Sequence, residues 1–160
     1  PPLAVDHAQI GDSGRERRMS LFSSLSVSAS GLAAERTRSE VLVENMANAE
    51  TTRTPEGGPY RRKDVVFSSA PQTSPFSAVF QSEVSTGVQV SQIVEDSSAP
   101  EMRYQPGHPD ANADGYVAYP HINPAEDMVD LLDASRSYQG DVAAMTATKA
   151  MITSAIGLMK

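Results

Sequence analysis

The sequence contains no cysteine and no tryptophan, and it lacks long apolar and long basic runs. Without cysteine, the chain has no disulfide bond, no thiolate nucleophile and no cysteine-ligated metal site. No segment reaches the ~18–20 consecutive apolar residues of a membrane span, and residues 1–20 show no apolar core of a secretory signal peptide. The net charge is −7 and basic residues are not clustered, which argues against nucleic acid as a partner.

What the sequence does contain is a heptad pattern over its last 33 residues. Its positions alternate at gaps of three and four, and most are apolar or aromatic; this C-terminal seam comprises Met128, Leu131, Ser135, Tyr138, Val142, Met145, Lys149, Ile152, Ile156 and Met159. The pattern predicts a helix over about 125–159, which Asn123 would cap and Pro124 would begin. At ~1.5 Å per residue this helix is roughly 50 Å long, too long for the remainder of a small domain to cover. Its seam must therefore meet the N-terminal helix, a neighbouring subunit or water.

A weaker seam predicts a second helix over about 20–49. This N-terminal seam comprises Phe22, Leu25, Ala29, Leu32, Arg36, Ser39, Val43 and Met46. Between the helices the period changes to that of short strands, which we predict over 64–67, 76–80, 87–94 (with a bulge) and 115–119. The expected fold is α+β, with long terminal helices that pack as a coiled-coil-like pair or with neighbouring subunits, and a small, irregular antiparallel β-rich centre.

We divide the chain into an N-terminal extension over 1–18, the first helix over 19–50, the β-rich module over 51–122 and the second helix over 123–160. The extension has no periodicity and is followed directly by Met19. Met19 is therefore the expected natural start, with residues 1–18 not native to the protein.

Acidic and histidine side chains near the end of the central module are the best candidates for chemistry. Asp110 to Gly115 reproduces the first half of a calcium-binding EF-hand loop, but the twelfth position is His121 instead of a bidentate Glu. Asp, Asn and Gly also favour turns, and the spacing of His108 and His121 matches no metal-site pattern. No nucleophile elbow or activating base–acid pair is present. We therefore expect a turn, and no catalytic, cofactor or metal site.

Two stretches resemble bacterial flagellar basal-body rod proteins, and among them the proximal-rod members. The first runs from Gly31-Leu-Ala-Ala-Glu-Arg36 through Asn45-Met-Ala-Asn48 to a turn at 51–59. The second includes Tyr119-Pro-His-Ile-Asn-Pro124 and Ala134-Ser-Arg-Ser-Tyr138. The motif residues that carry the resemblance in the first stretch are Asn45, Ala47, Asn48, Thr51, Gly57, Gly58, Pro59 and Tyr60.

The resemblance implies a non-enzymatic subunit that is exported by the flagellar type III apparatus without a cleaved signal peptide. It further implies polymerisation into a helical periplasmic tube, with the terminal helices in an inner layer, that transmits torque from the membrane ring to the distal rod and hook. The implied partners are copies of the chain, other rod proteins, the membrane-ring protein and the export apparatus. The expected assembly residues are the following members of the two seams: Leu25, Ala29, Leu32, Val43, Met46, Met128, Leu131, Tyr138, Val142, Met145, Lys149, Ile152, Ile156 and Met159.

An alternative interpretation is a periplasmic binding or adaptor module whose helices merely dimerise. Such a module has a fixed stoichiometry in solution, whereas a rod subunit is a monomer in isolation and is incorporated into basal bodies.

Overall fold

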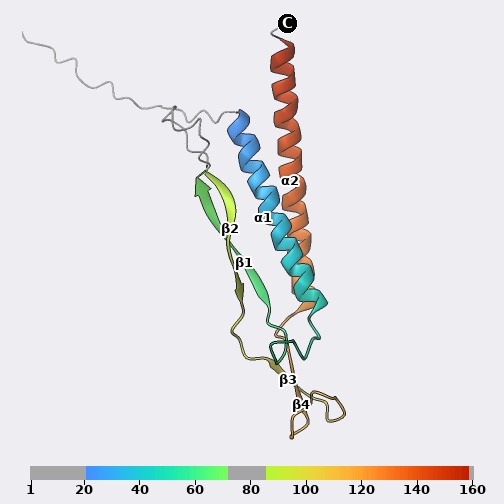
Figure 1. Ribbon diagram of the computed structural model, residues 1–160. Coiled ribbons are helices and arrows are strands. Elements are labelled where there is room, and N and C mark those ends of the chain that lie inside the picture. Colours follow the sequence, from blue (N-terminus) through green and yellow to red (C-terminus); the bar gives the residue numbers. More distant parts are fainter. Residues whose placement is uncertain (1–20, 72–85, 159–160) are drawn as a thin grey trace, which may run out of the picture.

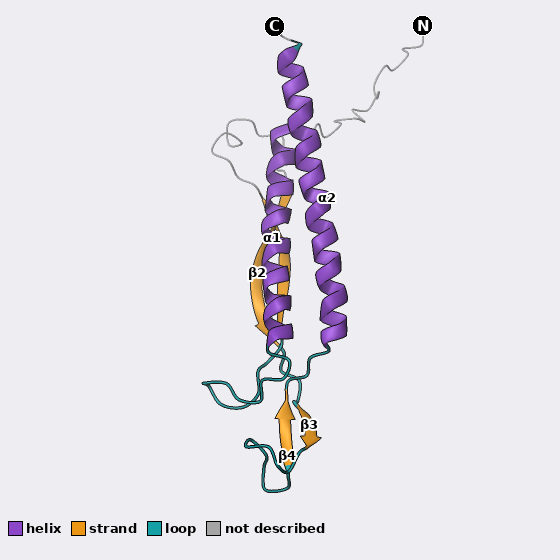
Figure 2. Cartoon of the chain, turned by 90° about the vertical axis from the view of Figure 1, so that its right-hand side faces the viewer, coloured by secondary structure: helices purple, strands orange, loops and turns teal. Residues whose placement is uncertain are grey.

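The computed structural model describes residues 21–71 and 86–158. The expected extension over 1–18, the strand predicted over 76–80 and Met159 lie outside this described part. The molecule is elongated and is built of three layers and a small end module (Figures 1 and 2). It is an α+β arrangement with one long helix near each end of the sequence.

The two helices run antiparallel, side by side. Helix α1 spans Leu21–Ala47 and helix α2 spans Pro124–Gly157. Asn123 caps α2 as predicted, because its side-chain oxygen accepts a hydrogen bond from the Ala125 N–H at 3.2 Å. The glycine at position 140 does not interrupt the helix. The C-terminal turns of α2 extend past the first described turn of α1 (Figures 1 and 2).

A β-hairpin forms the third layer, on the face of α1 opposite α2 (Figure 1). Strands β1 (Lys63–Pro71) and β2 (Thr86–Glu95) pair antiparallel. The predicted bulge is confirmed, since Val66 pairs with Gln92 but Phe67 pairs with Val90. Helix α1 packs against α2 and against both strands of this hairpin, so α1 is the central layer.

The start of α1 is rich in serine, yet it can lie in the central layer because serine hydroxyls there form hydrogen bonds with other groups of the protein. The Ser30 hydroxyl donates to the Val27 carbonyl at 2.7 Å. It also accepts a hydrogen bond from the Val88 N–H at 3.0 Å, which joins α1 to β2.

A second, shorter hairpin stands at the end of the molecule where α1 ends and α2 begins (Figure 1). Strand β3 (Glu101–Tyr104) pairs antiparallel with β4 (Tyr116–Tyr119). The sequence predicted β4 but not β3. Strand β3 is four residues long, is exposed throughout and follows a proline. It therefore lacks the alternation of buried and exposed residues from which a strand is predicted.

The buried core is small and is shared by α1, α2, the connection from α1 to β1 and the short hairpin. Its apolar members are Ala34, Val41, Leu42, Tyr60, Val117, Tyr119 and Ala134. No helix in the described ranges is long and apolar enough to cross a membrane.

Candidate assembly surface and motif junction

The most deeply buried stripe of α2 is made of small and polar side chains. It comprises Asp127, Ala134 and Thr148, which are separated by seven and fourteen residues. Asp141, in the same series, lies against Gly31 of α1, where a β-carbon built on the glycine would be 2.6 Å from the Asp141 Oδ2 atom. Glycine at position 31 therefore leaves room for the Asp141 carboxylate against α1.

Half of the positions of the predicted C-terminal seam lie one residue after the positions of this stripe, as Met128 follows Asp127. The members of the seam are therefore divided between half-buried and solvent-exposed positions. Leu131, Met145 and Ile152 are half-buried. The other described residues of the predicted C-terminal seam are exposed. They include Met128 (58% exposed), Ile156 (53%), Tyr138 and Val142 (42% each) and Lys149. Met151 and Leu158 add to the exposed apolar surface of the last turns.

The predicted N-terminal seam divides in a similar way. Leu25, Leu32 and Met46 are half-buried, whereas Ala29 and Val43 are exposed. The fully buried apolar residues of α1 are instead Ala34, Val41 and Leu42. Two layers contact α1 from opposite sides, so its buried positions do not form a single stripe.

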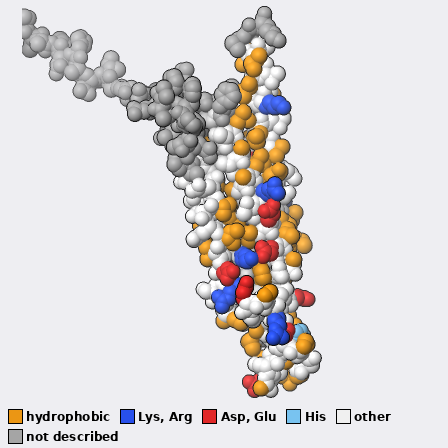
Figure 3. All heavy atoms as spheres, in the orientation of Figure 1, with side chains coloured by type: hydrophobic (Ala, Val, Ile, Leu, Met, Phe, Trp, Pro, Cys, Tyr) orange, Lys and Arg blue, Asp and Glu red, His pale blue; other side chains and the backbone are white. Residues whose placement is uncertain are grey.

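Charge is distributed unevenly along the molecule. Figure 3 shows Lys, Arg, Asp and Glu gathered over the lower part of the molecule, while the upper part of α2 carries mainly hydrophobic and uncharged atoms. Between Val142 and Leu158, Lys149 is the one charged residue. The part of α2 that extends beyond α1 is therefore an apolar surface with little charge to keep it in water.

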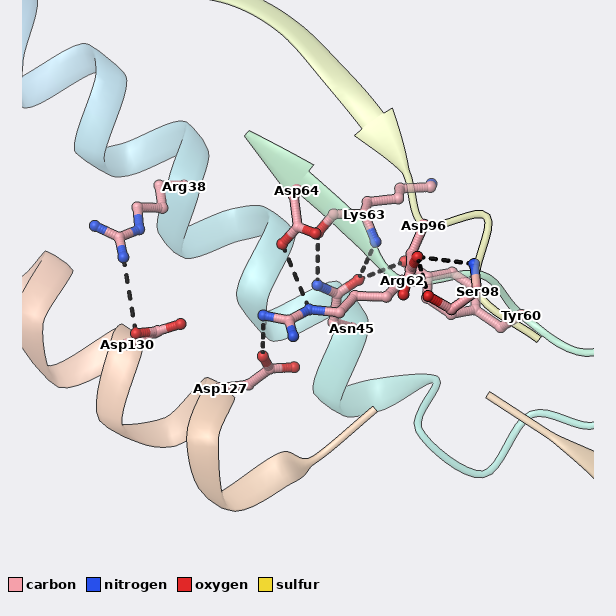
Figure 4. A network of polar contacts seen from close by, with 10 residues as sticks. All are labelled: Arg38, Asn45, Tyr60, Arg62, Lys63, Asp64, Asp96, Ser98, Asp127 and Asp130. Carbon is pink, nitrogen blue, oxygen red and sulfur yellow. Dashed lines mark hydrogen bonds and ion pairs between the residues drawn. The ribbon is translucent and has the colours of Figure 1, made fainter. Parts of the chain in front are cut away.

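Asn45 is the centre of a polar junction between α1 and the first hairpin (Figure 4). Its Nδ2 donates to the Lys63 carbonyl at 2.8 Å, and its Oδ1 accepts from the Lys63 N–H at 2.9 Å. The same Oδ1 accepts from the Tyr60 hydroxyl at 3.1 Å. The side chain of Asn45 is fully buried. Its amide thus supplies to the first residue of β1 both hydrogen bonds that a neighbouring strand would supply.

The rest of the motif forms the turn that returns the chain from α1 to β1. The Thr54 N–H donates to the Gly58 carbonyl at 2.8 Å. Gly57 and Gly58 have φ of 91° and 80°, which glycine adopts without strain. Asn48 and Thr51 are joined by a side-chain hydrogen bond of 3.2 Å. Ala47 is exposed and Pro59 half-buried.

An ion pair that the sequence did not predict ties the same junction to α2. Arg62 Nη2 lies 3.0 Å from Asp127 Oδ1, and Arg62 Nε lies 3.4 Å from Asp64 (Figure 4). Asp127 is fully buried, yet neither of its carboxylate oxygens accepts a hydrogen bond of good geometry in the described structure. Burial raises the pKa of Asp127 above its ordinary value, Arg62 opposes that rise, and Asp130, Asp64 and Glu126 add to it. Asp127 also looks like an ordinary first-turn helix acid, so the sequence offered no signal of this pairing.

This raised pKa predicts an unusual response to pH. The folded chain holds the Asp127 proton more tightly than the unfolded chain does, so charging Asp127 opposes folding above its folded pKa. That penalty disappears as the pH falls below the ordinary value of 3.8. We expect Asp127→Asn to be at least as stable as the parent at pH 7, and the parent to gain stability relative to the variant between pH 7 and pH 4. Urea unfolding of both proteins at each pH measures this. A marked loss of stability at pH 7 in Asp127→Asn, larger than in the control Asp130→Asn, would show that the attraction to Arg62 outweighs burial.

The acidic loop forms a turn whose oxygens are already engaged. Asn112 Oδ1 accepts from the backbone N–H groups of Asp114 and Tyr116 at 3.0 and 2.9 Å. Asp110 accepts from the Thr52 hydroxyl at 2.8 Å and lies 3.5 Å from Arg53. His108 accepts from the Asp110 N–H at 3.1 Å, and His121 lies outside this turn. The described residues contain no group of three or more acidic, His or Cys side chains arranged to hold a metal ion.

Comparison with known proteins places this architecture in a family. Residues 113–158 match the family model described as the C-terminal region of flagellar basal body rod FlgEFG proteins. The flagellar basal-body rod protein FlgC of Bacillus subtilis is 44% identical over 89% of this chain and 100% of its own length. The FlgC proteins of Borreliella burgdorferi and Salmonella typhimurium are 38% and 34% identical, over 89% and 88% of this chain and 99% and 98% of their own lengths. These relatives are at least 34% identical over nearly nine-tenths of the chain and almost all of their own length, and the chain belongs to the FlgC family of flagellar basal-body rod proteins.

Proposed function

We propose that the protein is a structural subunit of the flagellar basal-body rod that assembles through the outward faces of its two helices. The observation that carries this proposal is the row of exposed apolar side chains along α2, from Met128 through Val142 to Ile156. Exposed apolar side chains that recur along one helix favour an interaction site, because monomeric proteins expose few large apolar patches. Its position along one side of an elongated molecule suits lateral packing of parallel subunits around a tube axis.

The division of the seams supports packing with several neighbours. Positions such as Leu131, Met145 and Ile152 are half-buried within the chain and retain surface for a second contact. A helix that contacts α1 on one side and another chain on the other makes heterologous contacts, which extend into a helical assembly when they do not close into a ring. Copies of this chain, other rod proteins and the membrane-ring protein are the proposed neighbours.

The finer features of the function are also proposals. The subunit is exported by the flagellar type III apparatus without a cleaved signal peptide, stands in the proximal rod in the periplasm and transmits torque toward the distal rod and hook. It acts mechanically and without catalysis. The absence of cysteine suits a chain that must remain free of crosslinks before export.

A photo-crosslinking experiment tests this function. A photoreactive amino acid is placed at Val142, on the exposed row of α2, and basal bodies are purified after irradiation. We expect Val142 to crosslink to rod proteins, and the purified free chain to sediment as a monomer. The matched control carries the photoreactive group at Tyr104 on the end hairpin. A stable dimer in solution together with absence from basal bodies would instead support the adaptor interpretation.

A further inference from the structure

The end module of the molecule is a compact unit of its own. We define this tip module as residues 51–59 and 101–119. Val117 is fully buried within it, and the guanidinium of Arg103 lies 4.6 Å from the ring centre of Tyr119. The Tyr119 hydroxyl donates to Gln105 at 2.9 Å. Asp110 binds Thr52 and Arg53 of the other segment, so the two parts of the module are held together.

The tip module barely contacts the helical body. In the described ranges, β3 and β4 pack only against each other, and neither packs against a helix or against the first hairpin. Among the described residues, no hydrogen bond or ion pair joins the tip module to α2, β1 or β2. Four short segments connect the module to the body, at 48–50, 60–62, 96–100 and 120–123. The buried Tyr60, bonded to Asn45, anchors one side of this connection.

The opposite side of the connection is an open cleft of about 380 Å³. Glu101 and Arg103 line it from the tip module and Glu126 lines it from the first turn of α2, while Arg62 and His121 belong to the connecting segments. Arg62 also borders two smaller hollows of about 210 and 150 Å³. The 210 Å³ hollow lies between α1, β1 and α2 within the body, whereas the cleft and the 150 Å³ hollow border residues of the tip module and leave open space beside the connection.

The two walls of the cleft are complementary in charge. The tip module contributes Glu101 and Arg103 to the lining of the cleft, and Arg62 and Glu126 line it from outside the module, so an acidic and a basic side chain come from each side. In the open cleft Arg103 pairs with Glu101 of its own strand at 3.1 Å, and Glu126 has no ion-pair partner among the described residues. Movement of the tip toward the first turn of α2 would exchange the local Arg103–Glu101 pair for a pair between Arg103 and Glu126.

We propose that the tip module is hinged at Tyr60 and closes the cleft onto the first turn of α2, and that an Arg103–Glu126 ion pair holds the closed form. The hinge consists of a few residues at the ends of elements, as in other domain closures. A solvent-exposed ion pair shifts such an equilibrium by up to about fivefold. A neighbouring protein in the assembly that binds one form more tightly would shift the population toward that form.

Disulfide trapping tests the closure, and the cysteine-free sequence allows it without background. In the structure β3 makes no contact with α2, and a disulfide requires Cα atoms within ~7 Å of each other. We expect the double variant Arg103→Cys/Glu126→Cys to crosslink within the monomer at least tenfold faster than Tyr104→Cys/Glu126→Cys. Tyr104 is the neighbouring residue on the opposite face of β3 and is 65% exposed. Intact mass measured during mild oxidation gives both rates, and thermal melts of the reduced proteins establish that both fold.

A second measurement retains the native charges. Spin labels at Ala113→Cys on the tip and Ser137→Cys on α2 report the distance between the two bodies. We expect two distances in the parent and loss of the closed one in Glu126→Arg. Equal crosslinking rates, no crosslinking in either pair, or a single narrow distance that Glu126→Arg leaves unchanged would each overturn the hinge.

Discussion

Replacing Ile156 by aspartate is expected to abolish incorporation into the rod and motility while leaving the free subunit intact. Ile156 is 53% exposed, on the part of α2 that extends beyond α1, so in the monomer an aspartate there remains in water. In the proposed assembly the same carboxylate enters an apolar contact, at a cost of several kcal/mol unless it finds a partner. Such a cost repeated at every copy prevents assembly.

The measurement combines a motility assay with detection of the variant in purified basal bodies and a thermal melt of the free chain. Ser154→Asp is the matched control, because it places the same charge within the same turn but at an exposed polar position off the predicted seam. We expect this control to swim. Normal assembly of Ile156→Asp would remove the C-terminal turns from the assembly surface. A lower melting temperature of its monomer would show that Ile156 supports the fold of the single chain. Ile152 is a less discriminating position because it is half-buried against its own chain.

Replacing Asn45 by aspartate is expected to have the largest effect on the stability of the subunit itself. The substitution preserves shape but turns the Nδ2 donor into an oxygen that faces the Lys63 carbonyl, at the 2.8 Å separation of the present hydrogen bond. It also places a carboxylate at a fully buried position. Unsatisfied buried polar groups cost about 1–3 kcal/mol each, and a buried charge costs more. We expect a loss of about 3 kcal/mol, or a melting temperature lower by about 10 °C.

Asn48→Asp is the control for this substitution. Asn48 also donates from Nδ2 to a backbone carbonyl, that of Glu44 at 2.9 Å, but at a solvent-exposed bond at the end of α1. Chemical denaturation of both variants gives the difference. Equal effects of the two substitutions would mean that the Asn45 amide does not hold β1 to α1.

The sequence predicted the features that repeat along the chain and missed those that depend on distant pairs. Both helices follow from their heptad patterns and from the cap at Asn123, and the bulge follows from the broken alternation in β2. The facing stripe of α2 could not be predicted, because Asp127 and Asp141 are acidic side chains within an otherwise apolar pattern. Asp127 turns inward because Arg62, 65 positions earlier in the numbering, reaches it from the start of β1.

The motif junction around Asn45 was likewise predicted only in part. The motif around Asn45 was identified from its resemblance, but the spacing of residues 45, 60 and 63 does not reveal that one amide completes the hydrogen bonding of a strand end. Strand β3 was missed because its stabilising partners lie in β4 and its four residues are all exposed. Which seam positions contact another chain remains a prediction for the experiments above.

Gly31 of α1 and the side chain of Asp141 of α2 lie against each other, so an atom added at position 31 would overlap the other residue. A methyl group at position 31 would occupy the space that the Asp141 carboxylate fills. Residues 110 positions apart in the sequence thus restrict each other's side chains. An alanine at position 31 therefore requires a different rotamer or a smaller side chain at position 141.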